Sequence, residues 1–146
     1  MPRADFLCVP RLRVRWAEVD MQKIVFNGHY LTYIDTAISE YWREIGLPYP
    51  QGYVERYGSD VYLRKATVDY LGSAGYDDVL EICCRVARLG RSSMTFAFEI
   101  YREPEPAPLV TAELVYVNAD RAMRPAALPD DLRQRVMRYE RVAPRT

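Results

Sequence analysis

The sequence predicts an α+β protein in which a curled antiparallel sheet of about five strands wraps around one long central helix, with a further helix at the C-terminus. Three observations predict this class. The chain opens with a strictly alternating segment, continues with one amphipathic segment of helical period, and then holds four extended segments separated by turn residues. Because the helical segment is rich in aromatic side chains, we expect the sheet to curl around it.

The first strand is predicted at residues 11–16. Leu12, Val14 and Trp16 alternate with three arginines, so one face is apolar and the other is charged. Residues 17–28 show no sustained period and contain Glu18, Asp20, Lys23, Asn27 and Gly28. They predict a loop with a short apolar insert at 24–26.

The long helix is predicted from about Asn27 to Ile45. Its apolar residues recur at spacings of three and four, and polar residues occupy the other side. Gly46 and Pro48 supply the end, since glycine accepts the left-handed cap and proline does not continue a helix.

The four later strands are predicted at 61–71, 79–88, 92–102 and 109–118, as neighbours in an antiparallel meander. The segments 79–88 and 92–102 alternate between apolar and other residues, so each of these two strands is expected to bury one face. Leu89–Arg91 predicts a tight hairpin, whereas the three prolines within 102–108 predict a looser connection. Residues 129–139 predict the C-terminal helix, because Asp130 and Asp131 suit the dipole at its start.

Composition narrows the function classes. The 146 residues suit one domain spanning 1–146, and the 20 basic residues equal the 20 acidic ones, which argues against a nucleic-acid partner. We find no signal peptide and no apolar run long enough for a membrane span, so a cytoplasmic location is expected. The three cysteines, Cys8, Cys83 and Cys84, are expected to be reduced packing residues, and a single histidine argues against a metal site.

The segment Arg13-Val-Arg-Trp-Ala-Glu-Val-Asp20-Met-Gln-Lys-Ile-Val-Phe-Asn-Gly-His-Tyr30 resembles the 4-hydroxybenzoyl-CoA thioesterase and YbgC-like family of hot-dog enzymes. Further matching blocks stand at 77–82, 89–93 and 111–117, so the resemblance covers roughly residues 11–118. It implies the hot-dog fold, an acyl-CoA thioesterase activity with no cofactor, and CoA as part of the substrate.

The resemblance also implies residue roles. Asp20 matches the family's catalytic carboxylate, which attacks the thioester directly or activates a water; without the match, a turn aspartate is the simpler interpretation. The peptide N–H of Asn27 matches the donor to the thioester oxygen, a role that suits the electropositive start of a helix.

The remaining implied site residues surround these two. The resemblance implies that the acyl pocket is lined by Ile24, Val25, Phe26 and Tyr30. His29, at the entry of the predicted helix, is expected to line the same pocket. The resemblance also implies that Arg91, Ser92 and Ser93 lie near the CoA phosphates of the same or a neighbouring subunit.

Two positions depart from the family pattern. Lys23 stands where many members have glycine, and it could pair with Asp20, hold CoA or face solvent. Asn27 stands where histidine is common, which keeps the N–H and removes a possible acid.

A homodimer or a homotetramer is expected, because hot-dog protomers leave a sheet edge and the open side of the pocket to be covered by a partner. Three alternatives remain open on sequence alone. The substrate could be an acyl-carrier-protein thioester, the reaction could be that of a hydratase or dehydratase using His29 with an acid, or the protein could bind acyl-CoA without turnover.

Overall fold

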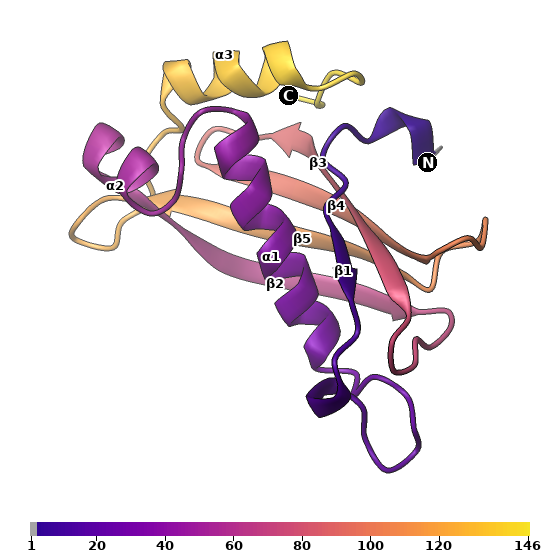
Figure 1. Cartoon of the computed structure of the whole chain (residues 1–146). Coiled ribbons are helices and arrows are strands. Elements are labelled where there is room, and N and C mark those ends of the chain that lie inside the picture. The colour runs from indigo at the N-terminus through magenta and orange to yellow at the C-terminus, as the bar shows by residue number, and fades with distance from the viewer. Residues whose placement is uncertain (1–2) are drawn as a thin grey trace.

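The computed structural model describes residues 3–146 (Figure 1). In chain order, the α-helices and strands are β1 (Arg11–Arg13), α1 (His29–Glu44), α2 (Gln51–Tyr57), β2 (Asp60–Tyr70), β3 (Val79–Leu89), β4 (Ser93–Arg102), β5 (Val110–Ala119) and α3 (Asp130–Tyr139). Two short 3₁₀ helices, η1 (Arg3–Asp5) and η2 (Trp16–Glu18), flank β1. Within these residues, no helix combines the length and the apolar character needed to cross a membrane.

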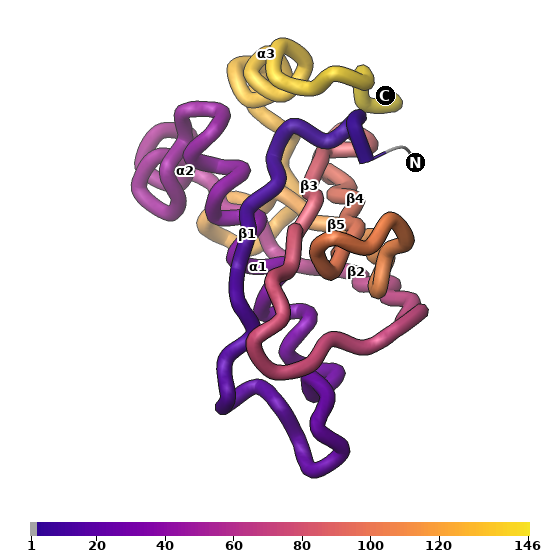
Figure 2. Tube along the Cα trace, turned by 45° about the vertical axis from the view of Figure 1, so that its right-hand side comes forward, coloured from indigo at the N-terminus to yellow at the C-terminus, as the bar shows by residue number. Residues whose placement is uncertain are grey.

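The five strands form one antiparallel sheet in the order β1-β3-β4-β5-β2. The predicted meander therefore holds for β3, β4 and β5 but is wrong for β2, which pairs with β5 and not with β3, because the connection at 71–78 carries the chain across the sheet instead of forming a hairpin. Figure 1 shows α1 crossing the concave side of this curled sheet, and Figure 2 shows the same layers from another side. The α+β class and the hot-dog arrangement of a curled sheet around one helix are therefore confirmed.

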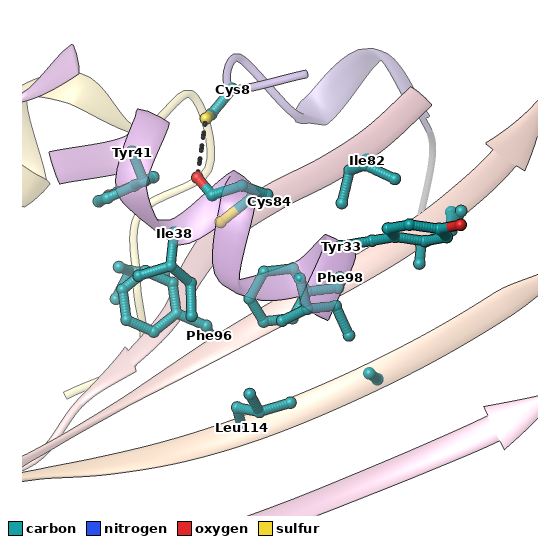
Figure 3. Packing of buried hydrophobic residues seen from close by; sticks show 14 of the residues in the cluster. Cys8, Tyr33, Ile38, Tyr41, Ile82, Cys84, Phe96, Phe98 and Leu114 are labelled. Atoms are coloured by element: carbon teal, nitrogen blue, oxygen red, sulfur yellow. Dashed lines mark hydrogen bonds between the residues drawn. The ribbon is translucent and has the colours of Figure 1, made fainter. Parts of the chain in front are cut away.

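The core lies between α1 and the sheet (Figure 3). Ile34, Ala37 and Tyr41 of α1 have no exposed surface, and they face equally buried strand residues such as Phe96 and Leu114. The helix-facing residues of the strands alternate with outward-facing ones, which is why one face of each strand reads as apolar in the sequence.

The three cysteines are buried, free thiols, as expected from the sequence. Cys8 and Cys84 belong to the main core, and the Cys8 thiol lies 3.9 Å from the Ala37 carbonyl oxygen (Figure 3). Cys83 points to the other face, where it packs with Phe6 and Tyr101.

The two edges of the sheet differ. The edge of β3 is covered by segments from both ends of the chain. β1 and Cys8 pair with it from the N-terminal side of the sequence, and Arg145, near the C-terminus, forms a bridge with Arg88. The opposite edge is β2, which pairs with β5 and is exposed along most of its eleven residues. One long strand therefore has an open side.

Three elements differ from what the sequence predicted. The first strand ends at Arg13 instead of residue 16, because the chain turns into η2, and Trp16 is 75% exposed instead of sharing the face of Leu12. The connector after α1 contains an unpredicted helix, α2, which buries Tyr53. The helix α1 begins at His29, two residues later than predicted.

The expectation that each strand buries one face is also wrong for β3. Cys83, Arg85 and Ala87 point away from α1 but are buried, because segments near both ends of the chain cover them. Phe6 packs against Cys83, and the Arg85 guanidinium donates to the carbonyl oxygen of Val142. These contacts join residues too distant in sequence to be read from a local pattern.

Candidate active site

Asp20 lies in a tight turn that leads toward α1. Its N–H donates to the Ile24 carbonyl (2.9 Å), its own carbonyl accepts the Lys23 N–H (2.9 Å), and its Oδ1 accepts the Gln22 N–H (2.8 Å). An antiparallel bridge between Val19 and Val25 closes the turn. One carboxylate oxygen therefore anchors the turn, and within residues 3–146 the other oxygen, Oδ2, has no hydrogen bond.

The same turn occurs a second time in the chain. The Asp120 N–H donates to the Arg124 carbonyl (2.9 Å), and Asp120 Oδ1 accepts the Ala122 N–H (2.9 Å). A bridge between Ala119 and Pro125 closes it. Because this copy follows β5, far along the chain from the start of α1, the turn alone does not identify a site. What distinguishes Asp20 is its position just before α1.

Glu18 holds the Asp20 turn in place, a role that the sequence did not suggest. Its Oε1 accepts the Arg15 N–H (2.8 Å) and the Tyr33 hydroxyl (3.0 Å), and its Oε2 accepts Nη2 of Arg15 (2.6 Å) and Nε (3.0 Å). Burial acts to raise the pKa of Glu18, but the hydrogen bonds from Arg15 and Tyr33 keep it below its usual value. The available signal was the spacing of Arg15 and Glu18, three residues apart.

Asn27 lies at the entrance to α1, immediately before the N-cap residue Gly28. Its carbonyl accepts the Tyr30 N–H (3.4 Å) and the Tyr70 hydroxyl of β2 (3.3 Å). In the described part of the chain its N–H has no hydrogen-bond acceptor. An exposed, unpaired N–H at the positive end of a 16-residue helix is suited to bind an oxygen that carries negative charge.

The predicted acyl-pocket residues lie in two environments. Val25 is 3% exposed and Tyr30 is 2% exposed, so both belong to the core, and the Tyr30 hydroxyl accepts the Ala74 N–H (3.0 Å). Phe26 is 50% exposed, and Ile24 is half-buried. The Phe26 ring lies so close to Gly28 that a Cβ there would meet it at 3.0 Å. Whether these residues line an acyl pocket stays a prediction.

His29 opens α1, with its ring 5.8 Å from that of Phe26 in an edge-on contact. No ion pair or hydrogen bond joins its side chain to a carboxylate among residues 3–146. A hydratase would need such a pair, so the geometry of this chain does not favour that alternative.

Lys23 adopts a left-handed backbone conformation, with φ of 65°. Its side chain is exposed, and no ion pair with Asp20 is formed in the described structure. Of the three interpretations of this lysine, pairing with Asp20 is therefore the one that the geometry does not support.

The connection between β3 and β4, which carries Arg91, Ser92 and Ser93, lies at the other end of the molecule from the loop that precedes α1 (Figures 1 and 2). The Arg91 carbonyl accepts the Leu128 N–H (2.8 Å), and the Ser92 carbonyl accepts the Asn118 N–H (2.8 Å), so the hairpin is tied to the segment around α3. The two regions are thus not brought together within one chain, which argues against a CoA contact in the same subunit.

A cavity of about 550 Å³ opens on the sheet face away from α1, lined by residues such as Arg85, Glu113 and Val142. Its lining includes no residue of the Asp20 turn or of the entrance to α1. In a single chain, Asp20 and Asn27 therefore belong to a surface rather than to this cavity.

Comparisons with known proteins agree with the fold. A family model described as the thioesterase superfamily matches residues 22–108. The acyl-CoA thioester hydrolase YbgC of Escherichia coli is 30% identical over 122 residues, covering 83% of this chain and 89% of the relative. A chloroplastic acyl-acyl carrier protein thioesterase of Arabidopsis thaliana is 24% identical, covering 89% of this chain and 67% of the relative. A crystal structure of a Pseudomonas aeruginosa protein superimposes with a TM-score of 0.83 at 27% identity, covering 97% and 98% of the two chains.

Proposed function

Because the chain belongs to the thioesterase superfamily and is therefore a thioester hydrolase, we propose that its substrate is an acyl-CoA and that the Asp20 carboxylate drives the hydrolysis. One observation carries the proposal. Two groups lie at the ends of the short segment 20–27 that precedes α1. Asp20 has one carboxylate oxygen without a hydrogen bond, and the Asn27 peptide N–H has no acceptor in the described chain. They are the two groups that thioester cleavage needs.

Two routes use these groups. In the first, the Asp20 carboxylate takes a proton from water, and the resulting hydroxide attacks the thioester carbonyl carbon. In the second, a carboxylate oxygen attacks that carbon, CoA departs, and water hydrolyses the mixed anhydride and restores Asp20. Either route consumes one water and yields CoA and a carboxylic acid. Collapse of the tetrahedral intermediate breaks the C–S bond, and the departing thiolate takes up a proton.

The developing oxyanion is proposed to accept the Asn27 N–H. Removal of one such donor typically costs about 3–4 kcal/mol of transition-state stabilisation. Asparagine offers no acid at this position, and the reaction tolerates this because a thiol, with a pKa of roughly 8.5, leaves as the thiolate more readily than an alcohol or amine would. No metal or redox cofactor takes part in this scheme.

A homodimer would complete the site. The Tyr70 end of β2 reaches Asn27 through its hydroxyl, whereas Tyr62, near the other end, is in register with Val117 and, through it, with Ser93 of the β3–β4 hairpin. Antiparallel pairing of two β2 strands would place the Tyr70 end of one protomer beside the Tyr62 end of its partner. The hairpin carrying Arg91–Ser93 would then approach the partner's Asp20 turn, which supports the neighbouring-subunit interpretation of the CoA contact.

The test is CoA release from acetyl-, isobutyryl-, palmitoyl- and benzoyl-CoA by wild type and Asp20→Asn. We expect turnover of at least one of these substrates and a fall in kcat of at least roughly a hundredfold in the variant, since a group that activates the nucleophile is removed. Circular dichroism establishes that the variant is folded.

Asp120→Asn is the matched control, because Asp120 forms the same turn away from α1. It should keep the wild-type kcat. Binding of acyl-CoA without turnover by wild type, or full activity of Asp20→Asn, would contradict the proposed chemistry.

An acyl carrier protein is the second thiol carrier to test, because one relative bears that activity in its name. The same acyl groups loaded on holo-acyl carrier protein should be hydrolysed with a lower kcat/KM than their CoA thioesters. The reverse order would favour the carrier-protein substrate.

A further inference from the structure

We infer that Glu18 and Tyr33 are positioning residues, which hold the Asp20 carboxylate and the Asn27 N–H at the relative position that the reaction needs. The inference rests on the proposed function, since it concerns the same turn. Neither residue is proposed to touch the substrate. Their role follows from the hydrogen bonds that join the turn to α1.

The side chain of Glu18 holds the chain that leads into the turn. Its carboxylate closes back on the Arg15 N–H and also accepts the Tyr33 hydroxyl, one helical turn inside α1. The start of the turn is thereby fixed to the same helix whose N-terminus lies beside Asn27. A rigid element thus sets the position of a loop carboxylate.

The main chain of Glu18 holds the chain that leaves the turn. Its carbonyl accepts the N–H of Phe26 (3.0 Å), the residue immediately before Asn27. The Val25 N–H is in turn held by the Ala74 carbonyl (2.9 Å). Both ends of the turn therefore meet at Glu18, so that a displacement of this residue moves Asp20 and Asn27 relative to each other.

The burial of Glu18 fits a positioning role. Its side chain is 7% exposed, although that of its partner Arg15 is 77% exposed. A buried carboxylate is costly unless it is paired and hydrogen-bonded, and this one accepts four hydrogen bonds. Such a fully satisfied group has one geometry, whereas an apolar residue of similar size would leave the turn free to shift.

The chain offers a matched control at the other end of α1. The Tyr41 hydroxyl donates to Glu140 (2.7 Å), which also accepts the Val86 N–H (2.8 Å). This is again a helix tyrosine bonded to a buried glutamate, and it ties α1 to β3 and α3 rather than to the Asp20 turn. Loss of the Tyr41 hydroxyl should lower stability without altering catalysis.

The experiment measures kcat, KM and thermal midpoint for Glu18→Gln, Tyr33→Phe and Tyr41→Phe, using the acyl-CoA that wild type hydrolyses fastest. Glu18→Gln places an amide N–H against the Arg15 donors, and we expect kcat to fall roughly 10–100-fold with little change in KM. Tyr33→Phe removes one hydroxyl and should lower kcat several-fold. Tyr41→Phe should lower the thermal midpoint by about as much as Tyr33→Phe does and keep the wild-type kcat.

Wild-type kcat in both Glu18→Gln and Tyr33→Phe, beside an inactive Asp20→Asn, would overturn the inference and leave the proposed function standing. An equal fall in kcat for Tyr41→Phe would also overturn it, since general destabilisation would then explain the effect. Full activity of Asp20→Asn would instead reject the proposed function. If Glu18→Gln does not fold, Tyr33→Phe decides, because it removes a single oxygen atom.

Discussion

At the scale of single residues, Lys23 has a backbone angle φ that is unfavourable for its residue type and lies inside the Asp20 turn. With φ of 65° it occupies the left-handed region, which costs a non-glycine residue about 1 kcal/mol. The hydrogen bonds of Asp20 on either side of the turn hold it there. A glycine at this position would adopt the same conformation without that cost.

Lys23→Gly should therefore keep kcat within about twofold and change the free energy of unfolding by less than about 1 kcal/mol, because relief of strain offsets the greater freedom of the unfolded chain. Lys23→Val should destabilise by about 1–2 kcal/mol and lower kcat, since a β-branched residue resists a positive φ. Urea denaturation and CoA-release assays measure both quantities.

Met123, with φ of 63° in the second copy of the turn, provides the control. Met123→Val should lose similar stability without losing kcat. Equal kcat losses in Lys23→Val and Met123→Val would contradict the link between this angle and the site.

At the scale of elements, the Glu140 carboxylate joins α1, β3 and α3. Glu140 caps the end of α3, accepts the Tyr41 hydroxyl of α1, and accepts the Val86 N–H where β3 shifts register against β4. Burial raises the pKa of Glu140, although hydrogen bonds from Tyr41 and Val86 partly oppose this shift. A carboxyl with a raised pKa stabilises the fold most at low pH, and this contribution is lost as pH rises through the folded-state pKa.

Glu140→Gln should accordingly be more stable, relative to wild type, at pH 8 than at pH 5. At pH 8 the wild type bears the cost of a buried charge, and the amide does not. Urea midpoints of both proteins at the two pH values measure the difference. A difference in unfolding free energy that is the same at both pH values would show that the Glu140 pKa is not raised on folding.

At the scale of the whole molecule, the uncovered side is the β2 side of the sheet. Leu63 of β2 is 51% exposed and Tyr70 is 49% exposed, and the strand edge beyond them has no neighbour in the described chain. Exposed apolar residues beside an open strand edge favour pairing with a second copy. The proposed homodimer therefore uses the side of the chain that also holds the entrance to α1.

Leu63→Glu should convert the proposed homodimer to monomer and lower kcat, because each proposed site needs a partner. Sedimentation velocity and CoA release at the same protein concentration provide the two readouts. Met137→Glu, at a residue of α3 with 43% exposure, should leave both unchanged. A monomeric wild type with full activity would reject the dimeric site.

The Asp20 turn, which is the proposed catalytic site, was only partly predictable. Asp20 and Asn27 stand out by resemblance to a family motif, and the loop between the first strand and the long helix follows from its lack of period. Glu18 could not be identified in the same way, because its role depends on Tyr33, fifteen residues later and on another element. The helix α2 was missed because its seven residues are too few to show a period.

Local patterns by themselves determined the α+β class, the long amphipathic helix and the presence of four later strands, since hydrophobic period and turn residues act over short stretches of chain. They did not determine the order of those strands in the sheet, because β2 pairs with β5 and not with its neighbour in sequence, β3. The tertiary structure decided which segments distant in sequence lie together and which edge of the sheet stays open. It ties the Asp20 turn to α1 through Glu18, carries the Arg91 hairpin to the far end of the molecule, and leaves β2 as the open edge. These features depend on contacts between residues distant in sequence, which form only when the sheet closes around the helix.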